Sequence, residues 1–127
     1  MNFLGIDFGL KHIGISLATT ILAEPLTILD NDKSSAQKIN LLCQQHQIGI
    51  VIIGVSEGKM AQKSREFGQR LQQTLGLPVK FHDETLSSHE AKQKLRHAKK
   101  SLRDQPQDAY QATVMLQDYL DTHTDNL

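Results

Sequence analysis

The sequence has few of the features that mark secreted, disulfide-linked or membrane proteins. Cys43 is the only cysteine among 127 residues, so no disulfide holds the monomer together, and a reducing cytoplasm is its natural setting. No signal peptide is evident, because the N-terminal apolar run is short and contains Asp7, and no apolar run approaches membrane-spanning length. We therefore expect a cytoplasmic protein with no membrane contact that forms one domain over residues 1–127.

The chain also lacks net charge, since 14 Lys and Arg balance 14 Asp and Glu, and the total charge predicts no partner. The distribution is uneven, because residues 92–103 hold six basic residues and no acid. The six are Lys92, Lys94, Arg96, Lys99, Lys100 and Arg103. A solvated helix face is the ordinary interpretation of such a run, but charged helix surfaces usually mix signs. The single sign therefore favours a surface that contacts nucleic-acid phosphates.

Hydrophobic patterning predicts the element order β-β-β-α-β-α-β-α-α. The predicted strands span residues 3–8, 13–18, 21–29, 50–53 and 77–82, and the predicted helices span residues 35–46 and 60–75, begin at residue 87, and span residues 104–121. Pro25 favours an edge or a bulge for the third strand, and Gly49 is expected to end the first helix. The unbroken β-branched run at residues 50–53 is typical of a parallel central strand. These elements predict an α/β fold whose mixed five-stranded sheet starts with three antiparallel strands, continues with parallel strands and carries helices on both faces.

Three acids lie where a carboxylate is costly to bury. Asp7 interrupts the first strand, Glu84 follows the last strand, and Asp108 shares an apolar arc of the final helix. For Asp7 alone, a strand-end carboxylate that accepts hydrogen bonds in the turn is an equally good interpretation. If the first and fourth strands are neighbours, however, the three carboxylates converge at one end of the sheet. Such an oxygen site suits Mg²⁺ or Mn²⁺, and a pair of ions suits phosphodiester hydrolysis, one activating water and the other stabilising the leaving oxygen.

Three ordered blocks of sequence resemble the YqgF family of RNase H-like, RuvC-type nucleases. The blocks are Asp7-Phe8-Gly9 with Lys11 and Gly14, then Phe81-His82-Asp83-Glu84 with Leu86 and Ser87, and finally Asp108-Ala109 with Ala112 and Leu116. The resemblance covers essentially the whole chain. Members of the YqgF family are described as pre-16S rRNA nucleases and also as Holliday junction resolvases. It implies an RNase H-like fold and a divalent-metal site in which Asp7, Glu84 and Asp108 are both the catalytic acids and the metal ligands.

The chain departs from the pattern of that family at three places. Leu10 replaces the usual Thr or Ser after the first block, and Thr85 replaces a common Arg that would clamp phosphate. The loop over residues 54–59 is shorter than usual and lacks a Pro. These changes affect contacts with the substrate more than metal binding.

Other polar residues near these blocks have weaker claims to a role. Lys11, in the hairpin turn, joins the six basic residues as a candidate for binding nucleic acid, although a solvated turn lysine is equally consistent. Successive strand residues face opposite sides, so only one of Asp83 and Glu84 can reach the metals, and the family match favours Glu84. The histidines His12, His82 and His89 are more typical of surface or strand-end positions than of proton-transfer groups.

Taken together, the sequence favours a metal-dependent nuclease that processes the 5′ end of pre-16S rRNA. Its expected partner is nucleic acid, with an rRNA precursor ahead of branched DNA, and the chain is expected to be a monomer or a homodimer. Three alternatives stay open: a Holliday junction resolvase, which needs a symmetric dimer, an inactive nucleic-acid-binding or ribosome-assembly module, and an ATPase of the actin and sugar-kinase superfamily. The ATPase is least favoured because those proteins duplicate the fold and this chain has room for one copy.

Overall fold

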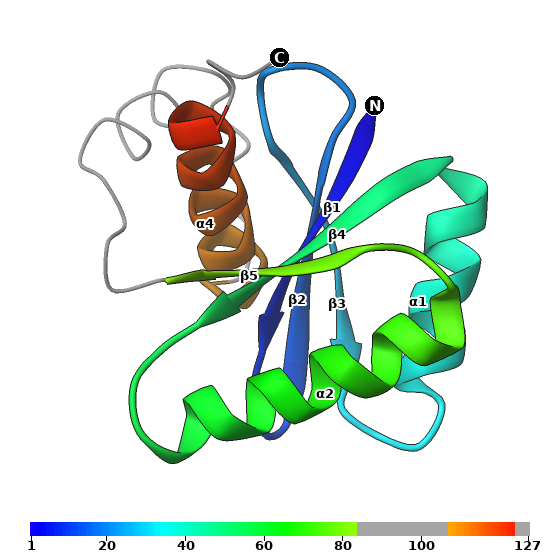
Figure 1. Ribbon diagram of the computed structural model, residues 1–127, viewed down its shortest axis with the longest axis vertical. Helices are drawn as coiled ribbons and strands as arrows, with labels where there is room; N and C mark the ends of the chain where they lie inside the picture. Colours follow the sequence, from blue (N-terminus) through cyan, green and yellow to red (C-terminus); the bar gives the residue numbers. More distant parts are fainter. Residues whose placement is uncertain (84–106, 124–127) are drawn as a thin grey trace.

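The computed structural model describes residues 1–83 and 107–123, except for the side chains of Gln107 and Asp108 (Figure 1). One five-stranded sheet has the strand order β3-β2-β1-β4-β5. The strands are β1 (Asn2–Phe8), β2 (His12–Ala18), β3 (Glu24–Asp30), β4 (Ile48–Val55) and β5 (Val79–Asp83), and the helices are α1 (Ser35–Gln45), α2 (Lys59–Leu75) and α4 (Gln107–His123). The first three strands pair antiparallel, while β4 pairs parallel with both β1 and β5. The mixed sheet is therefore as predicted, and the first and fourth strands are neighbours, which was the condition for the three carboxylates to converge.

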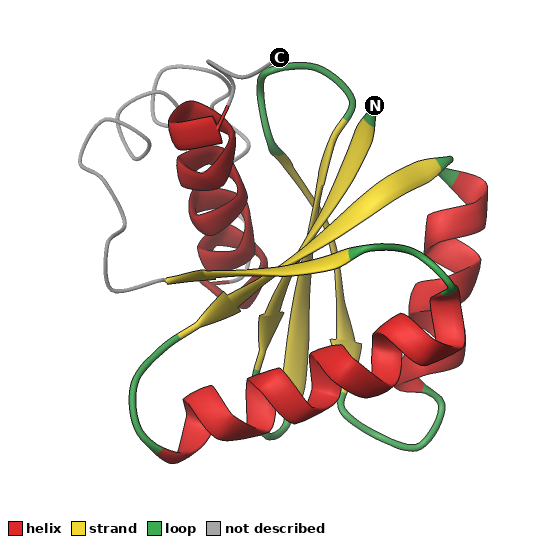
Figure 2. Cartoon of the chain, in the orientation of Figure 1, coloured by secondary structure: helices red, strands yellow, loops and turns green. Residues whose placement is uncertain are grey.

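Helices cover both faces of this sheet, with α1 and α2 on one side and α4 on the other (Figure 2). Side chains of a strand alternate between faces. Leu4 and Ile6 of β1 accordingly pack in the core beneath α1 and α2. Phe3, two positions before Gly5, packs in the core beneath α4. Asp7 follows the same alternation, so it lies on the α4 side of β1.

The glycine expected to end the first helix does not do so. Helix α1 ends at Gln45 with His46 as its C-cap, and Gln47 itself takes the left-handed conformation with φ 53°. Gly49 lies inside β4. The prediction was wrong because Gln47, and not a glycine, takes the left-handed conformation that follows the helix. Gly49 then lies in the extended backbone of β4.

The other element boundaries agree with the patterning to within a few residues. The third strand begins at Glu24, three residues later than expected, and forms the edge of the sheet. Pro25 pairs with Ser16 where the β2–β3 register shifts, which confirms both an edge and a bulge at this proline. The helix expected to begin at residue 87 and its basic face lie outside the described residues. Over the described ranges, no helix is long and apolar enough to cross a membrane.

Cys43 packs in the core beneath α1 and serves as a small apolar side chain there. Burial raises the pKa of its thiol to about 11. Because the thiolate is the reactive form of cysteine, this residue is suited to packing and not to chemistry.

Helix α4 lies unusually close to the first two strands. The Ser16 hydroxyl donates a buried hydrogen bond of 2.9 Å to the Ala112 carbonyl in α4. A Cβ atom on Gly5 would collide with Ser16 Oγ and would lie 2.9 Å from the Leu116 Cβ. The absence of a side chain at Gly5 therefore allows the helix to sit directly on β1 and β2.

Gln117 fixes the same helix to the β2–β3 connection. Its Oε1 accepts a 2.8 Å hydrogen bond from the Ala23 N–H, and its Nε2 donates a 3.0 Å hydrogen bond to the Ile21 carbonyl. Gln117 is fully buried, and its bond to the Ala23 N–H satisfies a polar group that is buried as well. The position of α4 along the sheet is thus set by the hydrogen bonds of Ser16 and Gln117 as well as by apolar packing.

We expect Gly5→Ala to lower the free energy of unfolding by about 1–3 kcal/mol, because the added methyl group overpacks the contact between β1 and α4. Gly49→Ala is the matched control in β4, since the atoms nearest its Cβ belong to the exposed Met1 side chain, which is free to move away. Urea unfolding followed by circular dichroism measures both. Equal stability of the two variants would show that the contact between β1 and α4 at Gly5 can accommodate a methyl group.

Candidate metal and nucleic-acid site

Asp7 stands near the carboxyl end of β1, on the face covered by α4. It is half-buried and pairs across the sheet with Gly14 of β2 and Gly54 of β4. Paired residues project to the same face of a sheet, so neither neighbour places a side chain beside the Asp7 carboxylate. On the opposite face, the Phe8 ring packs against Phe67 of α2 with centroids 4.7 Å apart. The acid is therefore held on an anchored strand end, with a glycine opposite it on each neighbouring strand.

The turn after β1 is fixed by backbone and side-chain hydrogen bonds. The Gly9 N–H donates to the His12 carbonyl at 3.0 Å, and a Cβ on Gly9 would lie 2.5 Å from that oxygen. Asn31, after β3, donates from Nδ2 to the Gly9 carbonyl at 2.8 Å and from its backbone N–H to the Lys11 carbonyl at 2.9 Å. Leu10 and Lys11 are exposed at the tip. Lys11 is thus presented to solvent from a rigid turn close to Asp7.

Helix α4 brings its first turn to the same end of the sheet. It runs antiparallel to β1, because Ala112 lies at the level of Ser16 whereas Tyr119 lies near Phe3, with ring centroids 6.3 Å apart. Residue 108 is one helical turn before Ala112, about 6 Å further along the axis toward the strand end that carries Asp7. The backbone of α4 is therefore placed as the predicted convergence of Asp7 and Asp108 requires.

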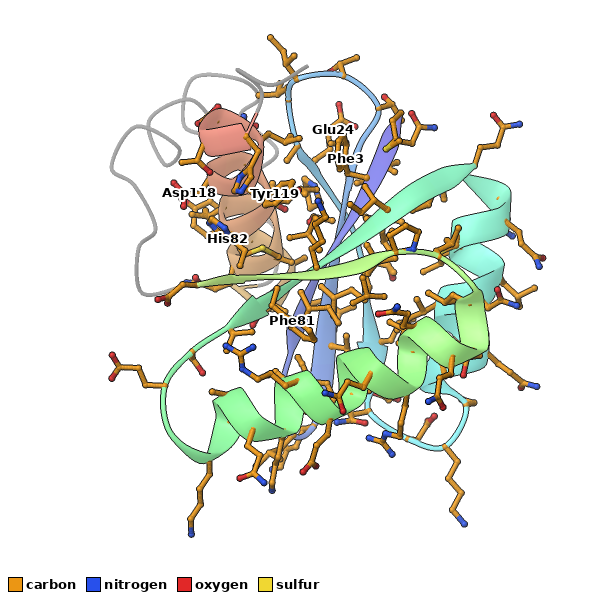
Figure 3. All side chains as sticks on the ribbon, viewed as in Figure 1. Phe3, Glu24, Phe81, His82, Asp118 and Tyr119 are labelled. Carbon is orange, nitrogen blue, oxygen red and sulfur yellow. The ribbon has the colours of Figure 1, made fainter. Side chains whose placement is uncertain are left out.

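The register of β5 separates Asp83 from the Asp7 face. His82 pairs with Gly54, the partner of Asp7, and contacts α4 on the same side of the sheet. Figure 3 shows Phe81 and His82 on opposite sides of β5. Asp83 has the parity of Phe81 and lines a pocket with it against α2. Asp83 thus lies away from Asp7, which leaves Glu84, outside the described residues, as the better candidate of the adjacent pair.

The described part of the chain contains no group of three or more His, Cys, Asp or Glu side chains that could hold a metal ion. Glu84 and the Asp108 side chain lie outside that part, and Asp7 is the described member of the expected triad. Its oxygen donors and its glycine-flanked position fit a hard divalent cation that keeps several waters. The six basic residues from Lys92 to Arg103 also lie outside the described residues.

A family model described as RuvX: Holliday junction resolvase matches residues 1–122. The chain belongs to this family. A Dehalococcoides mccartyi relative named "Putative pre-16S rRNA nuclease" is 37% identical over 89% of this chain and 92% of that protein. An Anaeromyxobacter relative of the same name is 33% identical over 95% of this chain and 97% of that protein. This RuvX membership confirms the YqgF resemblance and favours a nuclease over the ATPase alternative.

Solved structures similar to this RuvX chain share its fold at low sequence identity. Thermus thermophilus RuvC in complex with a Holliday junction substrate has a TM-score of 0.65 at 16% identity, covering 98% of this chain and 97% of that one. The fowlpox virus resolvase in complex with Holliday junction DNA has a TM-score of 0.62 at 14% identity, covering 96% and 98%. These likenesses confirm the RNase H-like α/β fold.

A buried His–Asp pair in this RuvX chain was not expected from the sequence. The His82 Nε2 lies 2.7 Å from the Asp118 Oδ2, and the two side chains are 11% and 3% exposed. A carboxylate accepts hydrogen bonds, so the imidazole N–H donates. Tyr119 packs edge-on against the His82 ring at 5.7 Å and stacks on His123 at 4.1 Å, and Figure 3 shows His82, Asp118 and Tyr119 together between β5 and α4.

This pair connects the two elements that flank residues 84–106. His82 lies two residues before Glu84, and Asp118 lies on the helix whose first turn carries Asp108. The pair therefore fixes the end of β5 against α4 and has a positioning role in the fold. Asp118 lies off the apolar arc that singled out Asp108, because residues two positions apart on a helix, such as Leu116 and Asp118, do not share a face. The helical pattern therefore gave no signal for it, although residues 112–120 of α4 are all buried.

We expect Asp118→Ala to lower the free energy of unfolding by about 1–3 kcal/mol, because it leaves the His82 ring nitrogen without this acceptor in a buried site. Asp30→Ala is the matched control, since Asp30 contacts His12 at 3.4 Å between exposed side chains and should change stability by less than about 0.5 kcal/mol. Urea unfolding measures both variants. A loss at Asp118 no larger than that at Asp30 would contradict the role of the pair.

Proposed function

We propose that the protein is a divalent-metal-dependent nuclease that hydrolyses phosphodiester bonds in structured nucleic acid, with a 16S rRNA precursor as its favoured substrate. The observation that carries the proposal is the placement of Asp7. A half-buried carboxylate stands at the carboxyl end of a central strand, between two glycines, and α4 delivers its first turn to the same end. Ligand sites of open α/β sheets lie at this edge.

In this proposal Asp7, Glu84 and Asp108 are the catalytic acids and would hold Mg²⁺ or Mn²⁺. A pair of such ions would supply Lewis acidity for water and for the leaving oxygen. The chain contributes fixed geometry, because Asp7 stands on a strand paired on both sides, next to a turn fixed by Asn31. Rigid placement of carboxylates keeps the reacting groups in line without reorganisation.

Lys11 and the six basic residues between Lys92 and Arg103 would hold the substrate backbone. Lys11 is exposed at the tip of the β1–β2 turn, where a long cationic side chain can reach a phosphate near Asp7. Such contacts position the nucleic acid and carry no sequence information. With Leu10 at the tip and Thr85 after Glu84, fewer phosphate contacts come from the loops than in most of the family, which gives the basic run a larger share of binding.

An rRNA precursor is favoured because the relatives from Dehalococcoides mccartyi and Anaeromyxobacter carry that substrate in their names. A four-way DNA junction is the second candidate, because the description of the matching family model favours it. The two differ in the assembly they require: junction resolution needs two symmetric sites and hence a homodimer, whereas one site suffices for an rRNA end. We place the activity in the cytoplasm, where the single buried thiol stays reduced.

The central test is Asp7→Asn, which keeps the size of the side chain and removes its charge. We expect cleavage with Mg²⁺ or Mn²⁺ to fall at least ~100-fold, because several kcal/mol of electrostatic stabilisation are lost, while the unfolding midpoint changes little. Asp30→Asn, at an exposed edge-strand position, is the control and should cleave like the parent. Unchanged cleavage by Asp7→Asn would refute the assigned site.

The same assay identifies the substrate when two labelled nucleic acids are offered in parallel. One is a precursor fragment spanning the 5′ end of 16S rRNA, and the other is a four-way DNA junction. Preferred cutting of the RNA by a monomer would support the rRNA precursor as the substrate. Symmetric cutting of the junction by a dimer would instead identify the protein as a resolvase. Binding of either without metal-dependent cutting at any concentration would replace the nuclease by a binding module.

The basic run makes a separate prediction about salt. Replacing Lys99 and Lys100 with Gln should weaken nucleic-acid binding and reduce the slope of log K against log salt by up to about two, because each phosphate contact releases counterions. Lys33→Gln with Lys38→Gln is the matched control, since both lysines are exposed near the start of α1. Equal effects of the two double variants in a fluorescence-anisotropy titration would show that the run has no special role.

A further inference from the structure

A pocket of about 290 Å³ lies at the carboxyl ends of β4 and β5, beside the first turns of α2. Its lining includes Ser56 and Glu57 from the loop after β4, Arg65 from α2, and Phe81 and Asp83 from β5. Liquid water occupies ~30 Å³ per molecule, so the pocket holds roughly ten waters. This volume is large enough for one nucleobase.

The pocket has a planar wall built by three residues. The Arg65 guanidinium lies over the Phe81 ring, with Cζ 5.4 Å from the ring centroid. The ring can lie so close to α2 because Gly68 has no side chain: a Cβ there would stand 2.6 Å from two ring atoms of Phe81. The cation–π contact with the ring holds the guanidinium, itself a planar group, at this side of the pocket.

The pocket and Asp7 lie at the same edge of the sheet but on opposite faces, the pocket on the α2 side and Asp7 on the α4 side. In the sheet register Asp7 is level with Gly54 of β4 and His82 of β5, and the next row pairs Val55 with Asp83, both of which line the pocket. The pocket therefore opens one row beyond the acid. It is about two strand spacings across the sheet from Asp7, or roughly 10 Å.

The chemistry of the lining selects the kind of ligand. A phosphate would meet the carboxylates of Glu57 and Asp83 as well as Arg65, and like charges oppose its entry. A neutral nucleobase instead finds a guanidinium plane to stack on, and unpaired bases are commonly bound by stacking on arginine or aromatic planes. Carboxylate oxygens and the Ser56 hydroxyl accept hydrogen bonds from N–H groups at the base edge, and guanine presents adjacent imino and amino N–H donors there.

We propose that this pocket binds one unpaired nucleobase of the substrate strand, guanine above all, next to the phosphate cleaved at the Asp7 site. The inference rests on the proposed nuclease function and identifies the base that the nuclease would recognise in its substrate. Stacking on Arg65 supplies most of the affinity, and the acceptors of Glu57, Asp83 and Ser56 supply the preference for an N–H edge. The enzyme would thereby cut beside an unpaired guanine and not within a continuous duplex.

The test measures binding without cleavage, so that it is independent of the catalytic acids. The probes are short single-stranded oligouridylates with one central guanine, or with an abasic unit in its place, titrated in EDTA by fluorescence anisotropy. Base stacking is worth ~1–3 kcal/mol, so we expect the guanine probe to bind about 5- to 100-fold more tightly than the abasic probe. Equal binding of the two probes by the parent protein would overturn the proposal.

Variants of the planar wall separate stacking from charge. Arg65→Lys keeps the charge but not the plane, and it should lose most of the guanine preference, as should Arg65→Gln. Lys63→Gln is the matched control, because Lys63 is exposed on α2 and does not line the pocket; it should keep the preference. Full binding by Arg65→Lys with loss in Arg65→Gln would mark a phosphate contact and overturn the base pocket.

The outcomes for this pocket and for the nuclease are distinguishable. A guanine preference that depends on Arg65 in a protein that cuts nothing would leave the pocket established and the nuclease function refuted. Metal-dependent cutting with no difference between guanine and abasic probes would establish the nuclease and refute the pocket. Urea unfolding of the Arg65 variants verifies that each is folded, and their exposed position makes this the expected result.

Discussion

The close seating of α4 on β1 and β2 is the contact on which the rest of the site depends. Gly5 leaves room for Leu116, and the Ser16 hydroxyl bonds the Ala112 carbonyl at 2.9 Å. A larger residue at Gly5 would lift the helix and shift its first turn away from Asp7. Because packed interiors transmit strain instead of absorbing it, a small change at this contact would alter the geometry of the acids at the far end of the helix.

A second constraint acts on the same face of the sheet, at its β5 edge. The His82–Asp118 pair is buried, and buried polar groups are tolerated when they satisfy one another. The pair joins strand β5 to helix α4 across 36 positions of sequence. The elements on either side of residues 84–106 are therefore tied to each other as well as to the sheet, and a catalytic acid attached to such elements inherits their rigidity.

The carboxyl edge of the sheet presents different chemistry on its two faces. On the α4 face, Asp7 stands between glycines and suits a cation. On the α2 face, the Arg65 guanidinium lies over the Phe81 ring, and in the proposed pocket it would stack on a planar base. Strand alternation produces this division, since His82 faces α4 while Phe81 and Asp83 face α2. In the proposed nuclease, one strand end would thus contribute to holding both the reacting phosphate and the base beside it.

The sequence by itself determined the element order, the mixed sheet and the family, because those depend on local periodicity and on motifs that are contiguous in the chain. It also singled out Asp7, whose charge inside an apolar strand is a local anomaly. Only the tertiary structure decided the left-handed turn at Gln47, the seat of α4 on Gly5, the His82–Asp118 pair and the Arg65–Phe81 wall. The turn depends on how α1 and β4 are joined in space, and the other three join residues 16 to 111 positions apart, whose proximity no local pattern encodes. Glu84, the Asp108 side chain and the basic run stay predictions of the sequence.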